Sequence, residues 1–100
     1  MVPPGASFEF FEGPVFAART KDLPELVEAI YVETRMRFDQ FDHLDGEFRT
    51  GQVMLGGAPF GFVVRKQSKA RMSLLWVWNK REEPMTHAQI LAKVEKWRRR

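Results

Sequence analysis

The chain has 100 residues, of which 44% are hydrophobic and 29% are charged, as in ordinary soluble globular proteins. We expect one domain over residues 1–100, with residues 1–7 as a flexible leader. The sequence has no cysteine, which excludes a disulfide framework and a cysteine-bound zinc. No apolar run approaches the ~20 residues that cross a bilayer, and the first residues lack the pattern of a signal peptide. These features predict a cytoplasmic protein without a membrane partner.

The formal net charge of +3 hides a division of charge along the chain. Residues 1–60 hold five basic and ten acidic side chains, a balance of −5. Residues 61–100 hold eleven basic and three acidic side chains, a balance of +8. A basic region of this kind is the expected footprint of a polyanionic partner. The alternative is that the two halves fold against each other and their charges pair.

The first half predicts a strand followed by helix. Phe8–Phe11 has strand-forming residues, and Gly13-Pro14 ends it. Asp22 is a suitable N-cap, with Glu25 three residues later as in a capping box. Apolar residues then recur every three or four positions from Leu23 to Phe41, which predicts one helix or two helices with a kink. The helical signal ends at the turn pair Asp45-Gly46.

The second half predicts three strands. They cover Gln52–Leu55, Phe60–Arg65 and Met72–Asn79, with Gly61 marking a bulge or a close approach. A short polar loop joins the last two strands, as in an antiparallel hairpin. Strict alternation would put Met72, Leu74, Trp76 and Trp78 on one face of the last strand, and Ser73, Leu75, Val77 and Asn79 on the other. Because both faces are largely apolar, we expect this strand to be covered on both sides.

The C-terminal segment predicts a helix with a defined start. Thr86 and Gln89 have the spacing of a capping box, and Met85 and Ile90 that of a hydrophobic staple. The order of elements predicts an α+β domain, with a small antiparallel sheet, one or two N-terminal helices and a C-terminal helix.

The sequence has few residues at spacings that suit metal binding or nucleophilic catalysis. Asp39, Asp42 and Asp45 share one face if this segment is helical, and three carboxylates can hold a divalent cation. A solvated acidic helix end is the favoured interpretation, so we expect no metal and no cofactor. His43 and His87 could form an acid–base pair on RNA, although His87 is better explained as the first residue of the last helix.

The richer pattern is cationic. Pairing of the last two strands would place Arg65, Lys66, Lys69 and Arg71 around one turn, while Lys80 and Arg81 leave the far end. Such cations can bind phosphates, and Trp76 or Trp78 could stack on an extruded base. The alternatives are that both tryptophans belong to the core and that the basic turn only protects a sheet edge.

Two segments resemble the RelE/HigB-like toxins of bacterial toxin–antitoxin modules. The first is Phe8–Phe16 (FEFFEGPVF) with Arg19 and Leu23, which is similar to the opening strand of these toxins. The second is residues 74–86 (LLWVWNKREEPMT), which is similar to their last strand and capped helix. The resemblance covers about half of the chain. In the second segment, the family's tyrosine, lysine, asparagine and glutamate positions hold, in order, Trp78, Lys80, Arg81 and Glu82.

The resemblance implies a RelE/ParE-like fold and a metal-independent endoribonuclease that cleaves mRNA on the ribosome and inhibits translation. Its reaction would be in-line attack of a ribose 2′-OH on the adjacent phosphate, with a cognate antitoxin as partner and no small-molecule cofactor. The catalytic residues that it implies here are Lys80, Arg81, Arg65 and Trp78. The RNA-binding residues are Arg49, Lys66, Lys69 and Arg71.

The chain departs from the family pattern at two basic positions. Only Arg49 is basic in residues 47–52, and Phe60 or Gly61 occupies the place of an arginine. Two alternatives therefore stay open. One is a non-catalytic RelE-fold protein or nucleic-acid-binding module. The other is a small phage-type inhibitor or adaptor that acts through its acidic helix and exposed aromatic residues.

Overall fold

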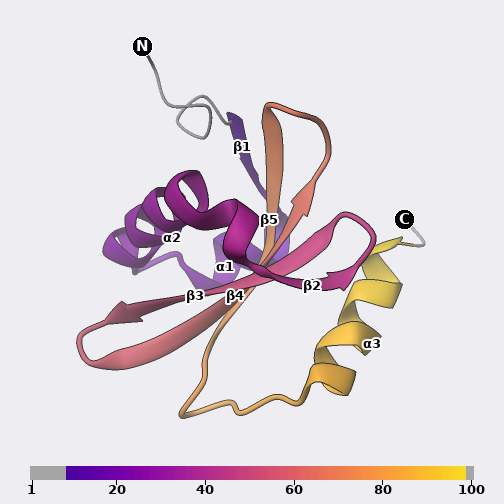
Figure 1. Ribbon diagram of the computed structural model, residues 1–100. Helices are drawn as coiled ribbons and strands as arrows, with labels where there is room; N and C mark the ends of the chain where they lie inside the picture. The colour runs from indigo at the N-terminus through magenta and orange to yellow at the C-terminus, as the bar shows by residue number, and fades with distance from the viewer. Residues whose placement is uncertain (1–8, 99–100) are drawn as a thin grey trace.

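The computed structural model describes residues 9–98, which form a five-stranded sheet with helices on both faces (Figure 1). The N-terminal part contains β1 (Glu9–Glu12), α1 (Pro14–Arg19) and α2 (Pro24–Arg37). A 3-10 turn, η2 (Phe38–Gln40), leads into β2 (Asp42–Asp45). The remaining elements are β3 (Phe48–Leu55), β4 (Ala58–Lys66), β5 (Arg71–Asn79) and α3 (His87–Arg98). The expected α+β class is therefore confirmed.

The sheet has the order β1-β5-β4-β3-β2, and its edge strand β1 runs parallel to β5. The other neighbouring strands are antiparallel, so the prediction of a purely antiparallel sheet is wrong. A parallel pair needs a long crossover connection, and here residues 13–70 supply it. Of the predicted first strand, Phe8 lies outside the described residues, and Glu9–Phe11 are in β1.

The predicted start of α2 is wrong. The helix begins at Pro24 with Leu23 as N-cap, and no side chain caps its first turn. Asp22 therefore does not form the expected capping box. Pro24 fits the start of the helix because proline has no N–H to leave unsatisfied and its φ is already helical.

The predicted end of this helical region is also wrong. The α-helix ends at Arg37, and Asp42–Asp45 pair with Phe48–Thr50 as a short edge strand. The sequence of β2 is mostly polar, and all of it except Leu44 is exposed. It therefore lacks the apolar alternation by which strands are recognised.

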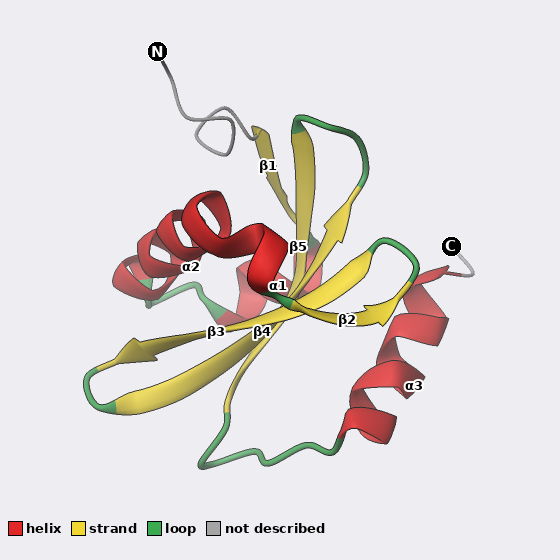
Figure 2. Cartoon of the chain, in the orientation of Figure 1, coloured by secondary structure: helices red, strands yellow, loops and turns green. Residues whose placement is uncertain are grey.

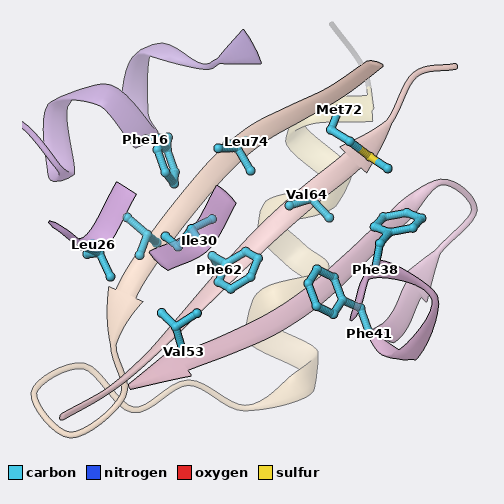
Figure 3. Packing of buried hydrophobic residues seen from close by; sticks show 11 residues of the cluster. Phe16, Leu26, Ile30, Phe38, Phe41, Val53, Phe62, Val64, Met72 and Leu74 are labelled. Carbon is cyan, nitrogen blue, oxygen red and sulfur yellow. The ribbon is translucent and has the colours of Figure 1, made fainter. Parts of the chain in front are cut away.

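Helices α1 and α2 lie on one face of the sheet, and α3 covers the other (Figure 2). We call the two apolar layers the α2-side core and the α3-side core. The α2-side core, shown in Figure 3, consists of Phe16, Leu26, Ile30, Phe38, Phe41, Val53, Phe62, Val64, Met72, Leu74 and Val77. The α3-side core consists of Phe48, Val63, Trp76, Trp78, Ile90 and Val94.

Strand β5 is buried on both faces, as predicted, but its alternation is interrupted by a bulge. Val63 pairs with Trp76 whereas Val64 pairs with Leu74, so Leu75 has no partner in β4. An extra residue in one strand reverses the facing of every residue beyond it. Met72 and Leu74 consequently pack in the α2-side core while Trp76 packs in the α3-side core. The expected single face of Met72, Leu74, Trp76 and Trp78 is therefore wrong.

Helix α3 begins as the sequence predicts. The backbone N–H of Thr86 donates to Gln89 Oε1 at 2.9 Å, and the N–H of Gln89 donates to Thr86 Oγ1 at 3.2 Å. Met85 and Ile90 both pack in the α3-side core. In the part of the chain that the structure describes, no helix is long and apolar enough to span a bilayer.

Candidate nucleic-acid interface

The residues predicted as one catalytic set lie at opposite ends of the sheet. Arg65 pairs with Ser73 near the β4–β5 loop, whereas the N–H of Lys80 bonds to Pro59 O at the far end of β5. A strand rises ~3.3 Å per residue, so these two positions are on the order of 20 Å apart. The fold therefore does not bring Arg65 together with Lys80 and Arg81.

Arg65 is neutralised and Trp78 is buried. The guanidinium of Arg65 contacts Glu47 Oε1 through Nε at 2.6 Å and through Nη2 at 2.5 Å. The indole of Trp78 is 3% exposed and stacks on Trp76 with ring centroids 4.8 Å apart. The prediction that Trp78 stacks on a base is therefore wrong for this structure, and the core alternative holds for both tryptophans.

Gly61 explains why Trp78 can lie flat against the sheet. A Cβ at position 61 would be 2.5 Å from Cζ2 of Trp78 and 2.9 Å from Cε of Lys80. Gly61, one of the two positions at which the resemblance would imply an arginine, is thus covered here by an indole ring and a lysine stem. The close approach that Gly61 predicted is confirmed, whereas the bulge lies in β5.

Lys80 lies at a polar cleft of about 240 Å³ beside the edge of the sheet. Its Nζ donates to Gln52 Oε1 at 2.6 Å, and the ion pair Arg37–Glu33 (2.7 Å) lies on the cleft wall. Asp42 of β2 also lines the cleft. Arg81 does not line it; its side chain is exposed, and its backbone N–H donates to Asn79 Oδ1 at 2.9 Å.

Two of the predicted RNA-binding residues meet at the ring of Phe38. The guanidinium carbon of Arg49 lies 4.3 Å from the ring centroid, and Nη1 donates to Phe38 O at 3.0 Å. Lys66 Nζ lies 5.6 Å from the same centroid. Within residues 9–98 neither cation has a carboxylate at ion-pair distance. Their charges are held in place but not neutralised.

A third cation of this kind, Arg35, was not predicted from the sequence. Its guanidinium carbon lies 5.1 Å from the Phe10 ring centroid and 5.7 Å from that of Tyr31. The two rings stack at 4.3 Å, and Tyr31 donates a 2.5 Å hydrogen bond to Glu12. Burial, followed by this hydrogen bond and the charge of Glu12, raises the pKa of Tyr31 to about 12. The contact between Arg35 and Tyr31 could have been inferred from the sequence, because the two residues are one helical turn apart.

These cations lie around one end of the α2-side core. Phe10 pairs with Met72, which in turn pairs with Lys66, so three neighbouring strands converge there. Beside them is a hollow of about 270 Å³ between β1 and the β4–β5 loop. Its lining includes Phe11, which is 58% exposed, and Arg71, whose nearest carboxylate is Glu9 at 3.8 Å. We call this region the cation–aromatic surface; it comprises Phe10, Phe11, Arg35, Arg49, Lys66, Lys69 and Arg71. Phe11 and Arg71 project from the other face of the sheet at its β1 edge, so the surface extends round that edge.

Metal-ligating residues do not gather in the same way. Asp39 is in η2 while Asp42 and Asp45 are in β2, so the three do not share a helical face. Asp45 instead forms an ion pair with Arg98. Among residues 9–98 no group of three or more histidine or acidic side chains could hold an ion.

Comparison with models of known protein families gives no match, and comparison with curated proteins gives none. The function must therefore be argued from the geometry of the described residues.

Proposed function

We propose that this protein binds single-stranded RNA through the cation–aromatic surface. The observation that carries the proposal is the pair Arg49 and Lys66, two cations at one ring that have no carboxylate at ion-pair distance among residues 9–98. A charge that the fold positions but does not neutralise is available to a phosphate. The non-catalytic nucleic-acid-binding alternative drawn from the sequence is thus the reading that the geometry supports best.

The adjoining hollow supports a single strand over a duplex. Phe11 is one of the few large apolar side chains left exposed in the described residues, and it lies beside Arg71 and Gln67. Aromatic faces next to a basic groove are the usual platform for unpaired bases, because every base can stack on them. Phosphates would contact Arg49, Lys66 and Arg35 on the α2 side of the sheet. Phe11 faces the other side at the edge strand β1, so the bound strand would pass round this edge to place a base on it.

The test is the salt dependence of binding to a short unstructured oligouridine, followed by fluorescence anisotropy. Removing Arg49 and Lys66 together, as Arg49→Gln with Lys66→Gln, should weaken binding and lower the slope of log K against log salt by about 1.4, since each lost phosphate contact contributes ~0.7 for a single strand. The control is Lys21→Gln with Lys96→Gln, which removes the same charge from two exposed positions elsewhere. Equal losses in both double variants, or no binding by the parent protein, would contradict the proposal.

Phe11→Ser separates stacking from charge. It should weaken binding roughly tenfold at every salt concentration, because one stacked base contributes about 1–3 kcal/mol. The salt slope should stay unchanged because no cation is lost. A variant with parental affinity would remove Phe11 from the binding surface.

A second candidate is the cytoplasmic toxin that the resemblance implies, a ribosome-associated mRNA endonuclease of RelE/ParE-like fold with a cognate antitoxin. The position of Lys80 in a polar cleft that Arg37 also lines favours it, because placed cations can stabilise a developing phosphorane charge. Arg65 and Trp78 take no part in this version. Induced expression should arrest growth and fragment mRNA, and Lys80→Ala should abolish both effects. Normal growth with intact mRNA would reject the toxin proposal and leave RNA binding untouched.

A further inference from the structure

One edge of the sheet is left open beside the cleft. Strand β2 pairs only with Phe48–Thr50, so residues 51–55 of β3 have β4 on one side and no strand on the other within the described chain. The β3–β4 turn has two residues, Gly56 (φ 56°) and Gly57 (φ 78°), which fits a type I′ hairpin.

The hairpin register fixes which backbone groups point outward. In a two-residue hairpin the closing pair, Leu55 and Ala58, is hydrogen-bonded, and every second pair along the ladder is bonded as well. Gln52 and Met54 therefore direct their N–H and C=O groups away from β4. Pro59 lies opposite Met54, at a position that requires no N–H from β4.

This edge lacks the features by which proteins prevent strand pairing. Residues 51–55 read Gly-Gln-Val-Met-Leu, without charge or proline, and their pairing with β4 has no bulge. The opposite edge, β1, is only four residues long and has Glu9 and Glu12 at its ends. Uncharged, regular edges are the ones that accept another strand.

Exposed apolar side chains flank the same edge. Val32 and Met36, one turn apart on α2, are 42% and 65% exposed. Val32 and Met36 immediately precede Glu33 and Arg37 in the sequence and are therefore about 100° further around the helix. Glu33 and Arg37 line the cleft together with Gly51 of β3. On the other face of the sheet Met54 is 57% exposed.

We propose that two copies of this chain pair antiparallel through residues 51–55 of β3, around a two-fold axis perpendicular to the sheet. This symmetry places both α2 helices on one face of the joined sheet, antiparallel across the junction. Met36 of one copy then lies toward Met36 of the other, with Val32 turned further from the sheet.

The charges on α2 select a second copy as the occupant. Glu33 and Arg37 are four residues apart and oppositely charged, so antiparallel helices bring Glu33 of each copy opposite Arg37 of the other. The uncharged edge is likewise complementary to itself, as an isologous interface requires. The cation–aromatic surface includes Arg49 of β3, but Arg49 pairs with His43 of β2 and lies outside residues 51–55, so the proposed junction does not use it.

Sedimentation velocity over a range of protein concentrations tests the proposal. The parent protein should sediment at twice the chain mass. Met54→Pro should be monomeric, because it removes an outward N–H and fills the edge while leaving the ladder to β4 intact. Met54→Thr, which keeps that N–H, should remain dimeric.

The helix contact has its own matched pair of variants. Met36→Lys should weaken the dimer at least tenfold, because it places two like charges across the junction. Val15→Lys changes a similarly exposed residue on α1 (44% exposed) and should leave the dimer unchanged. Circular dichroism verifies that each variant is folded. The proposal would be overturned if the parent protein were monomeric at every concentration. It would also be overturned if the dimer survived both Met54→Pro and Met36→Lys, even if the edge of β3 bound a strand from another protein.

Discussion

Tyr31 carries a residue-level prediction, since it is the only tyrosine in the sequence. Its pKa is raised from 10.0 to about 12 by burial and by the hydrogen bond to Glu12. An ultraviolet titration of tyrosinate absorbance should therefore have its midpoint near 12. Glu12→Gln should lower this midpoint because it removes the carboxylate, and Arg35→Gln should raise it because Arg35 lowers the pKa.

The sign of the accompanying stability change follows from the same shift. The folded state favours the neutral phenol, so the contribution to stability is complete below pH 10 and is lost as the pH rises toward about 12. Glu47→Gln, a carboxylate change in the segment that pairs with Arg65, serves as the control and should leave the tyrosine midpoint unchanged. A midpoint at the ordinary value of 10.0 in the parent protein would mean that the contact with Glu12 does not form.

At the scale of the element, the two long helices differ in how they begin. Thr86 and Gln89 exchange hydrogen bonds at the start of α3, whereas no side chain caps α2. Thr86→Ala should therefore lower the free energy of unfolding by about 1 kcal/mol. Asp22→Ala should lower it by less than about 0.5 kcal/mol, as for a surface residue without a specific contact.

Urea denaturation measures both changes, and Thr86→Ser is the matched control because it keeps the hydroxyl acceptor. If Asp22→Ala proved as costly as Thr86→Ala, α2 would have a side-chain cap after all. The contrast also explains why the capping box was predicted correctly at Thr86 but wrongly at Asp22. Both sites show cap residues at the right spacing, but the chain reaches α2 through α1, and Leu23 takes the cap position.

At the scale of the whole molecule, one sheet joins the two apolar layers. Strand β5 contributes Leu74 to the α2-side core and Trp76 to the α3-side core. Loss of either layer therefore exposes the strand on which the other depends, and we expect a single cooperative unfolding transition.

Tryptophan fluorescence and far-ultraviolet circular dichroism test this expectation. Trp76, Trp78 and Trp97, the three tryptophans of the sequence, all contact the α3-side core, whereas circular dichroism follows every helix and strand. The two probes should give the same midpoint in urea. A fluorescence transition at lower urea than the circular dichroism transition would mean that α3 detaches independently.

The sequence by itself determined the features that local pattern encodes. These are the α+β class, the capping box of α3, the β4–β5 hairpin and the burial of β5 on both faces. Each depends on residues a few positions apart, or on alternation within one strand, so the chemistry that produces it is visible in the linear order.

Only the tertiary structure decided the parallel direction of β1, the existence of β2 and the bulge at Leu75. It also separated Arg65 from Lys80 and gathered Arg35 with Lys66 near one end of a core. Strand direction, register and the grouping of charges depend on contacts between residues far apart in the chain. Their energies compete across the whole sheet, and no short stretch of sequence records the outcome.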